Sequence, residues 1–207
     1  MLSLKNRPVY LITDDSNFDF STLYRKVEQS IQGGASIIQL REKQSSSLEF
    51  YNHALKLKEL CNKHQALLII NDRLDIAQAV DADGVHLGQR DLPLVVARKI
   101  LGNKKIIGIS AKTTETALKA QEEGADYLGV GAVFPTSTKK DAEYISKEEF
   151  LDVRKMISIP IYAIGGINTR NAVELVNYKV DGIAVSSSIL NAADPEKTTA
   201  SFNNLFE

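Results

Sequence analysis

The chain of 207 residues carries 25 basic and 26 acidic side chains, and its net charge of -1 lacks the basic excess expected of a nucleic-acid or membrane-surface binder. Its hydrophobic fraction of 43% and charged fraction of 25% are ordinary for a globular domain. We therefore expect small-molecule partners, with neither nucleic acid nor a membrane among them.

The N-terminal residues become charged after four positions, so they lack the apolar core of a signal peptide. No apolar run approaches the roughly 20 residues that span a bilayer. The single cysteine, Cys61, cannot form an internal disulfide and is expected to be a reduced, buried thiol. These features predict a cytoplasmic protein, and a homo-oligomer is compatible with all of them.

Short apolar runs rich in β-branched residues recur along the chain and predict eight strands, at residues 8–13, 35–40, 66–70, 83–87, 105–110, 126–130, 160–165 and 181–185. Segments with helical spacing alternate with them, including residues 24–31, 48–60, 113–122, 147–156 and 172–176. This alternation predicts a parallel sheet with crossover helices. Eight units favour a single (β/α)8 TIM barrel, one catalytic domain over residues 1–207. Glycines in GGAS, DADG, EEGAD and YKVDG are expected to end helices in left-handed turns.

The active site of such a barrel lies at the C-terminal ends of its strands. After the second run, Gln39, Arg41 and Lys43 fall at alternate positions and would share one face. Arg binds phosphate oxygens bidentately and Lys adds a point charge, so this face suits a polyanion. The alternative is a strand end that frays into a solvated, charged loop.

Two aspartates follow neighbouring strands, Asp72 after the third run and Asp91 after the fourth. Mg2+ prefers one or two carboxylates together with waters and phosphate oxygens. The pair could therefore hold Mg2+ beside the basic face. Each aspartate could instead be a helix N-cap.

Residues 131–141 are rich in hydroxyls and lysines, which is typical of an active-site loop that binds an anion; a solvated loop is the alternative. Gly165-Gly166 and Ser186-Ser187 follow the last two runs, where barrels commonly build a phosphate site from backbone amides.

Several other kinds of chemistry lack their usual signatures. His53 and His64 lie in helical segments and are expected at the surface, and His86 has no second histidine or cysteine at ligand spacing. No GxSxG, GxGxxG or Walker sequence is present, so acyl transfer, dinucleotide binding and P-loop chemistry are not indicated.

Taken together, QLREK, INDR, DGVHLGQRD, IGIS, GADYLGVGAVFPTSTKKD, PIYAIGGI and DGIAVSSSI resemble the successive signatures of the thiamine-phosphate synthase family over nearly the whole chain. That family is a (β/α)8 barrel. Its members condense 4-amino-2-methyl-5-(hydroxymethyl)pyrimidine diphosphate with thiazole phosphate, which gives thiamine phosphate and pyrophosphate. The resemblance implies a transferase of thiamine biosynthesis that uses Mg2+, with pyrophosphate leaving before the thiazole nitrogen captures the pyrimidine cation.

The resemblance also implies roles for individual residues. Asp72 and Asp91 would bind Mg2+, and the catalytic groups would be Arg41, Lys43, Ser110 and Lys139. The pyrimidine diphosphate would contact Gln39, Leu40, Arg41, Glu42, Lys43, Asn71, Ser110 and Lys139. The thiazole phosphate would contact Thr136, Ser137, Thr138, Gly166, Ser186 and Ser187, with Ser186 at a position that is often aliphatic. Ala132 and Lys112 depart from the family's usual proline and histidine.

Two other functions compete with this reading. A related thiazole tautomerase shares the barrel and the thiazole-phosphate site but loses much of the pyrimidine and magnesium set, which is intact here. A non-catalytic sensor of a phosphorylated ligand would bind without turnover.

Overall fold

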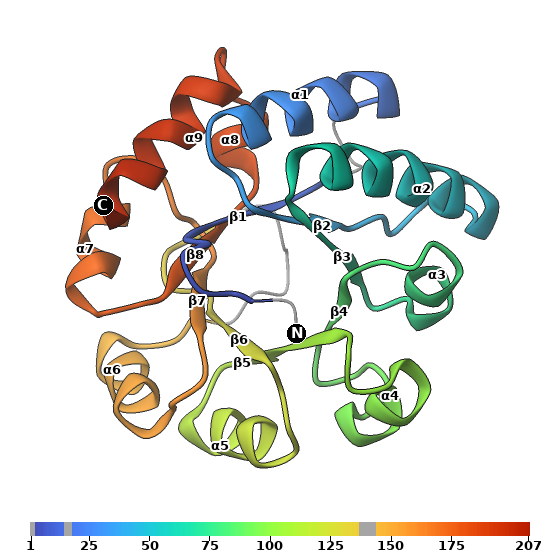
Figure 1. The fold of residues 1–207 in the computed structure, drawn as a ribbon. Helices are drawn as coiled ribbons and strands as arrows, with labels where there is room; N and C mark the ends of the chain where they lie inside the picture. Colours follow the sequence, from blue (N-terminus) through green and yellow to red (C-terminus); the bar gives the residue numbers. More distant parts are fainter. Residues whose placement is uncertain (1–2, 15–17, 137–143) are drawn as a thin grey trace.

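The computed structural model describes residues 3–14, 18–136 and 144–207. Its strands form a closed parallel barrel in which each strand pairs with the next and β8 pairs with β1 (Figure 1). The expected (β/α)8 barrel is confirmed. The strands are β1 (Val9–Ile12), β2 (Ile37–Leu40), β3 (Leu67–Asn71), β4 (Gly84–Leu87), β5 (Ile106–Ala111), β6 (Tyr127–Gly131), β7 (Ile161–Ile164) and β8 (Gly182–Val185).

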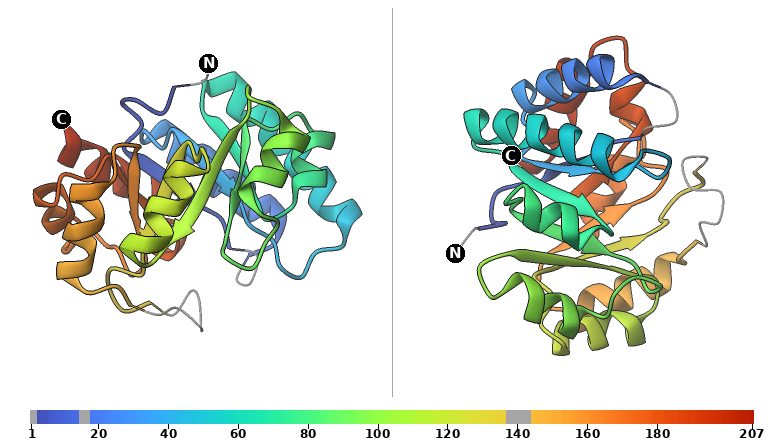
Figure 2. Two further views of the ribbon diagram at one scale, coloured as in Figure 1. Left: turned by 90° about the horizontal axis from the view of Figure 1, so that it is seen from below. Right: turned by 90° about the vertical axis from the view of Figure 1, so that its right-hand side faces the viewer.

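Helices surround this barrel, and the strand arrowheads point away from the N-terminus of the chain (Figure 2). In the described residues no helix combines the length and apolar character needed to cross a membrane. The helices are α1 (Phe20–Gln32), α2 (Ser47–His64), α3 (Leu74–Ala79), α4 (Leu94–Leu101), α5 (Thr114–Glu122), α6 (Lys147–Met156), α7 (Ala172–Asn177), α8 (Ser187–Leu190), α9 (Pro195–Asn203) and the 3-10 turn η1 (Asn204–Phe206).

The largest side chains of the barrel interior are three buried tyrosines, Tyr10, Tyr127 and Tyr162. Their ring centroids lie 5.4 to 5.9 Å apart, with the rings edge to face. Glycines on the neighbouring strands make room for them. A Cβ atom at Gly108 would lie 2.0 Å from Cζ of Tyr127, and one at Gly182 would lie 2.6 Å from Cε1 of Tyr162. In the interior, large tyrosine rings therefore pack directly against the backbone of glycines on neighbouring strands.

The glycines before strands serve two different purposes. Gly34 and Gly124 have positive φ angles of 103° and 92°, which confirms the left-handed turns expected there. In DADG and YKVDG the expectation was wrong, because the left-handed residues are Asp81 and Lys179. Gly84 is required instead by close approach, since a Cβ atom there would lie 2.1 Å from a carbonyl oxygen of β5.

The N-terminal end of the barrel carries a repeated contact. An aspartate just before β4, β6 and β8 accepts hydrogen bonds from the N–H of a residue at the start of the preceding strand and from a basic side chain of an outer helix. The three sets are Asp83 with Leu68 N–H and Lys58, Asp126 with Ile107 N–H and Arg98, and Asp181 with Ile161 N–H and Arg154, at donor–acceptor distances of 2.6 to 2.9 Å.

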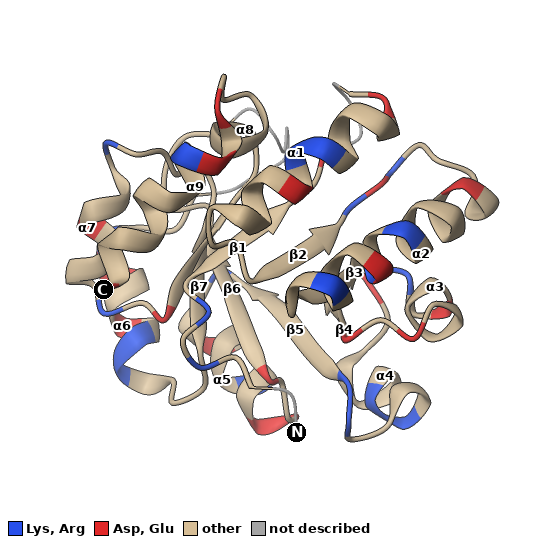
Figure 3. Cartoon of the chain, turned by 45° about the horizontal axis from the view of Figure 1, so that its top comes forward, with Lys and Arg blue, Asp and Glu red and all other residues tan. Residues whose placement is uncertain are grey.

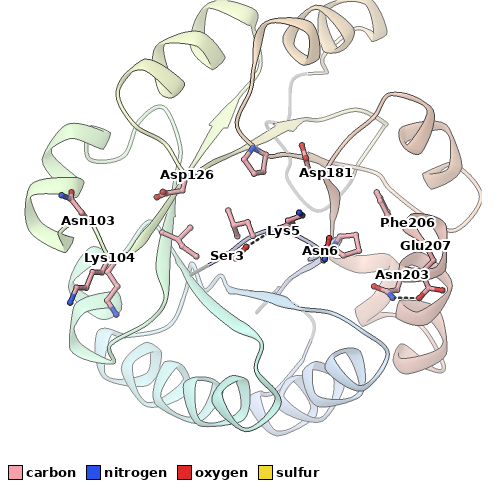
Figure 4. Close-up of a pocket in the computed structure, with 15 residues that line it drawn as sticks. Ser3, Lys5, Asn6, Asn103, Lys104, Asp126, Asp181, Asn203, Phe206 and Glu207 are labelled. Atoms are coloured by element: carbon pink, nitrogen blue, oxygen red, sulfur yellow. Dashed lines mark hydrogen bonds between the residues drawn. The ribbon is translucent and has the colours of Figure 1, made fainter. Parts of the chain in front are cut away.

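A cavity of about 720 Å³ opens at this same end, between the N-terminal segment and the strand starts (Figure 4). Among its lining residues, Asp126 and Asp181 belong to the repeated contact, and Lys105 bonds Asp81 and the carbonyl of Ala82. Because these charges already have partners, and because catalysis in such barrels occurs at the opposite end, we assign this cavity to the stabilising face.

Candidate active site

The first part of the site is the end of β2, where basic and acidic residues directly follow the strand (Figure 3). Gln39 is buried in the barrel, and its Nε2 donates to the hydroxyl of Tyr10 at 2.6 Å. Leu40 packs on the other face, in the outer core. The backbone N–H of Arg41 donates to Oγ1 of the buried Thr13 at 2.9 Å, so the residue directly after β1 holds the start of the charged segment in place. The backbone of the strand end is therefore not frayed at Arg41.

Glu42 points to the outside of the barrel. Its Oε1 lies 2.8 Å from Nδ1 of His53 on α2, while its Oε2 is buried and has no hydrogen-bond partner among the described residues. The ring of His53 stacks on Phe20 with centroids 3.7 Å apart. His53 is therefore partly buried instead of fully exposed as expected, and the side chain of Glu42 lies apart from that of Gln39.

The second part of the site is a charged cluster at the ends of β2, β3 and β4. The ammonium of Lys43 bonds the Asp72 carboxylate. Burial raises the pKa of Asp91 above its ordinary value, and the neighbouring Asp72 carboxylate raises it further, against the opposing hydrogen bond from Gly88 N–H at 2.7 Å. The structure therefore brings Lys43, Asp72 and Asp91 together.

Neither aspartate is a helix N-cap. The N-cap residue of α3 is Arg73 and that of α4 is Pro93, and neither helix receives a side-chain capping bond. Asp72 adopts a φ of 60° while its N–H bonds the carbonyl of His86. A non-glycine residue in this region of φ costs free energy, as is common at functional sites.

The donor set of this cluster fits Mg2+. Two partly exposed carboxylates leave the remaining positions to water and phosphate oxygens, as Mg2+ prefers. Within the described residues no three His, Cys, Asp or Glu side chains converge into a complete metal cage. Asp72 and Asp91 would therefore hold an ion only together with a ligand.

A line of hydrogen bonds crosses the interior beneath these groups. Oγ of Ser110, on β5, lies 2.9 Å from Nε2 of His86, on β4. Nδ1 of His86 lies 3.0 Å from the hydroxyl of Tyr127, which lies 2.8 Å from the hydroxyl of Tyr10. Because Tyr10 also accepts from Gln39, these five residues form one continuous chain, which we call the interior chain.

The third part of the site lies at the ends of β6 and β7. Phe134 N–H donates to the carbonyl of Gly165 at 3.1 Å. Gly166 has a φ of 65°, and a Cβ atom there would lie 2.3 Å from the carbonyl oxygen of Pro135. This contact places Thr136, the next residue, beside Gly166. Ser137, Thr138 and Lys139 lie outside the described residues.

The end of β8 joins this third part. Ser186 precedes α8, Ser187 is exposed, and Oγ of Ser188 donates to the carbonyl of Ile167 at 2.6 Å. Oγ of Ser186 is buried, with no hydrogen-bond partner in the part of the chain that the structure describes. The ends of β6, β7 and β8 thus form one surface of backbone and hydroxyl groups.

Sequence reasoning missed several residues that hold these parts in place. Thr13 anchors Arg41, and Nε2 of Gln89 donates to the carbonyl of Ser110 at 2.7 Å. His86 pairs in register with Asn71 and joins the interior chain. The available signal was position alone, because each of the three lies at or just beyond a strand end.

Comparisons with known proteins identify relatives of the whole chain. The family model described as "Thiamine monophosphate synthase" matches residues 9–189. A thiamine-phosphate synthase of Ruminiclostridium cellulolyticum is 50% identical over 96% of this chain and 94% of its own length. A thiamine-phosphate synthase of Methanobrevibacter smithii is 50% identical over 91% of this chain and 90% of its own.

Solved structures agree. A thiamine phosphate pyrophosphorylase from Pyrococcus furiosus superposes with a TM-score of 0.88 at 40% identity, covering 97% of this chain and 96% of that one. A 3-hexulose-6-phosphate synthase from Salmonella typhimurium has a TM-score of 0.69 at 14% identity, over 96% of this chain and 97% of that one, and shows only the shared fold. The chain belongs to the thiamine monophosphate synthase family.

Proposed function

We propose that this protein is a thiamine-phosphate synthase. It is a transferase that condenses the aminopyrimidine diphosphate with thiazole phosphate and releases pyrophosphate. The observation that carries this conclusion is 50% identity to thiamine-phosphate synthases over nearly the whole chain. The charged cluster of Lys43, Asp72 and Asp91 supports it, because a departing diphosphate needs cations around it. Lys43 and a Mg2+ ion held by the two aspartates would supply them.

In this proposal the diphosphate lies over the end of β2. Arg41 and Lys43 would donate charge-assisted hydrogen bonds to its oxygens. Asp72 and Asp91 would hold Mg2+, which stabilises the negative charge that develops on departing pyrophosphate. The ion pair between Lys43 and Asp72 shows that the ammonium lies beside the proposed ion site in the ligand-free protein.

The described site favours a leaving-group mechanism over covalent catalysis. Ser110 and His86 are close enough to resemble a nucleophile and its base. However, the second nitrogen of His86 meets the hydroxyl of Tyr127, where a catalytic triad would have a carboxylate. We therefore propose a dissociative reaction in which the aminopyrimidine cation forms as pyrophosphate departs.

The thiazole phosphate would lie against the ends of β6, β7 and β8. Backbone N–H groups of Gly166 and Ser187, with the hydroxyl of Thr136, supply neutral donors suited to a phosphate monoester. We also propose the cytoplasm as the compartment, since the buried Cys61 thiol agrees with a reducing environment.

The test supplies the purified protein with both substrates and Mg2+. Thiamine phosphate and pyrophosphate should appear in equal amounts. An electron-withdrawing substituent on the pyrimidine should slow the reaction, because it destabilises the cation. Isomerisation of a thiazole substrate with the diphosphate untouched would identify a tautomerase, and tight binding without turnover would identify a sensor; either result would refute the synthase.

Magnesium dependence is tested separately. Activity should vanish in excess chelator and return with added Mg2+. Asp72→Asn should raise the Mg2+ concentration required for half-maximal activity, or abolish turnover. Full activity of the metal-free protein would contradict the assignment of Asp72 and Asp91.

A further inference from the structure

We propose that Tyr10, Tyr127 and His86 are positioning residues that fix the direction of the hydrogen bonds at Gln39 and Ser110. The interior chain then presents an acceptor at one end and a donor at the other. This inference rests on the proposed function, because it concerns how an aminopyrimidine ring would be recognised. The three positioning residues are buried beneath the site and act through its two ends.

The direction of hydrogen-bond donation follows from counting the protons along the interior chain. Nε2 of Gln39 donates to the oxygen of Tyr10, so Tyr10 uses its single proton to donate onward to Tyr127. Tyr127 in turn has one proton, and it donates to Nδ1 of His86.

The imidazole completes the sequence. Because Nδ1 of His86 accepts, neutral His86 carries its proton on Nε2 and donates to the oxygen of Ser110. A proton on Nδ1 would instead have to donate to Tyr127, which would then donate to Tyr10. The proton of Tyr10 would have no acceptor in the chain, since the Gln39 amide nitrogen accepts nothing.

Burial keeps both phenols protonated, which this count requires. Desolvation raises the pKa of Tyr10 far above its ordinary value, and burial raises the pKa of Tyr127 as well. In such a low-dielectric interior a reversed or broken hydrogen bond leaves a polar group unsatisfied at high cost. The interior chain therefore has a single favourable direction.

The consequence at the site is a fixed pattern of donor and acceptor. Ser110 accepts from His86, so its own proton is available to a ligand. Gln39 directs one of its two amide N–H groups to Tyr10, which fixes the orientation of the amide and leaves its carbonyl oxygen as the acceptor for a ligand N–H. An aminopyrimidine carries both counterparts, an exocyclic N–H donor and ring-nitrogen acceptors. A hydroxypyrimidine in its keto form would meet this pattern with donor and acceptor reversed.

The direction can be read directly from the ligand-free protein by nuclear magnetic resonance. The chain has only three histidines, so long-range 1H–15N spectra will show three imidazoles. The variants His53→Gln and His64→Gln assign two of them, which leaves His86. We expect His86 to be neutral with its proton on Nε2. A proton on Nδ1, or on both nitrogens, at neutral pH would overturn the proposal, whatever the activity of the protein.

Kinetics test whether the interior chain acts on the substrate. Tyr127→Phe removes one hydroxyl from the chain, and Tyr162→Phe is its matched control. Tyr162 packs in the same interior, but its hydroxyl donates to the backbone carbonyl of Arg7 at 3.1 Å and is not part of the interior chain. Tyr127→Phe should lower kcat/KM for the pyrimidine diphosphate about tenfold. The KM for thiazole phosphate should not change, and Tyr162→Phe should leave both constants near wild type.

A double mutant separates positioning from general stability. Because Tyr127 is proposed to act partly through Ser110, Tyr127→Phe should cost less activity in the Ser110→Ala background than in the wild-type protein. Multiplicative effects of the two substitutions, or equal kinetics for Tyr127→Phe and Tyr162→Phe, would refute the proposal. An inactive wild-type protein would instead refute the proposed function, and the state of His86 would still test the direction of the chain.

Discussion

The substitution Gly108→Ala tests the packing that supports the interior chain. The new Cβ atom would lie 2.0 Å from Cζ and 2.4 Å from the hydroxyl oxygen of Tyr127. The ring cannot move aside freely, because its hydroxyl bonds Tyr10 and His86 and the ring packs edge to face with two other tyrosine rings. The clash must therefore be relieved by shifting strands or by breaking the interior chain.

The expected cost is that of overpacking a dense core, about 1–3 kcal/mol. A chain of this size loses about 2–4 °C of Tm per kcal/mol, so Tm should fall by about 2–12 °C. Thermal unfolding of the ligand-free protein, followed by circular dichroism, measures this shift. Activity well below Tm should also fall, because Tyr127 can no longer hold its place in the interior chain.

Gly129→Ala is the control. It adds the same methyl group on the inner face of the next strand, but the nearest atom is Cε1 of His86 at 3.0 Å, so Tm should fall less. Adding Tyr127→Leu to Gly108→Ala should cost less than the sum of the two single changes. Equal Tm values for wild type and Gly108→Ala would show that the tyrosine does not occupy the space beside Gly108.

Three further predictions concern single side chains. Since the pKa of Asp91 is raised in the folded protein, its stabilising contribution is present at low pH and is lost as pH rises through that pKa. Asp91→Asn should therefore raise the Tm of the metal-free protein at pH 7 and lose this advantage near pH 3; a lower Tm at pH 7 would contradict the cost of burying the carboxylate beside Asp72. Arg41→Ala should lower kcat/KM at least about tenfold in the coupled assay, and unchanged kinetics would place Arg41 in solvent. Burial raises the pKa of Cys61 to about 12, so iodoacetamide should label it only as fast as the protein unfolds, and rapid labelling of folded protein would show an exposed thiol.

The sequence predicted the barrel well because each strand carries its own apolar run, and these local signals order the whole fold. It also placed Asp72 and Asp91 correctly beside the basic segment, since strand ends of a closed barrel meet at one face. The short helices α3 and α8 and the helices α4 and α9 were not predicted, because their periodicity extends over few turns.

Contacts across the barrel could not be predicted in the same way. The interior chain joins residues 24 to 117 positions apart, and nothing in a single sequence records which inward side chains meet at one level. Tyr10 and Tyr127 therefore resembled ordinary strand residues. Glu42 was grouped with its charged neighbours, and only the position of His53 on α2 shows that its side chain points outward.

The aspartate contacts at the N-terminal end recur every second strand, at Asp83, Asp126 and Asp181. Each one joins two adjacent strands and one helix, and none shares a partner with another. The three contacts therefore stabilise the barrel independently. Removal of one aspartate side chain should speed amide hydrogen exchange mainly in the two strands that it joins. All three contacts lie at the end of the barrel opposite the site. Residues at the C-terminal ends of the strands can therefore be substituted without disturbing these contacts. A barrel of this kind can acquire a different active site at one end while the contacts at the other end keep it closed.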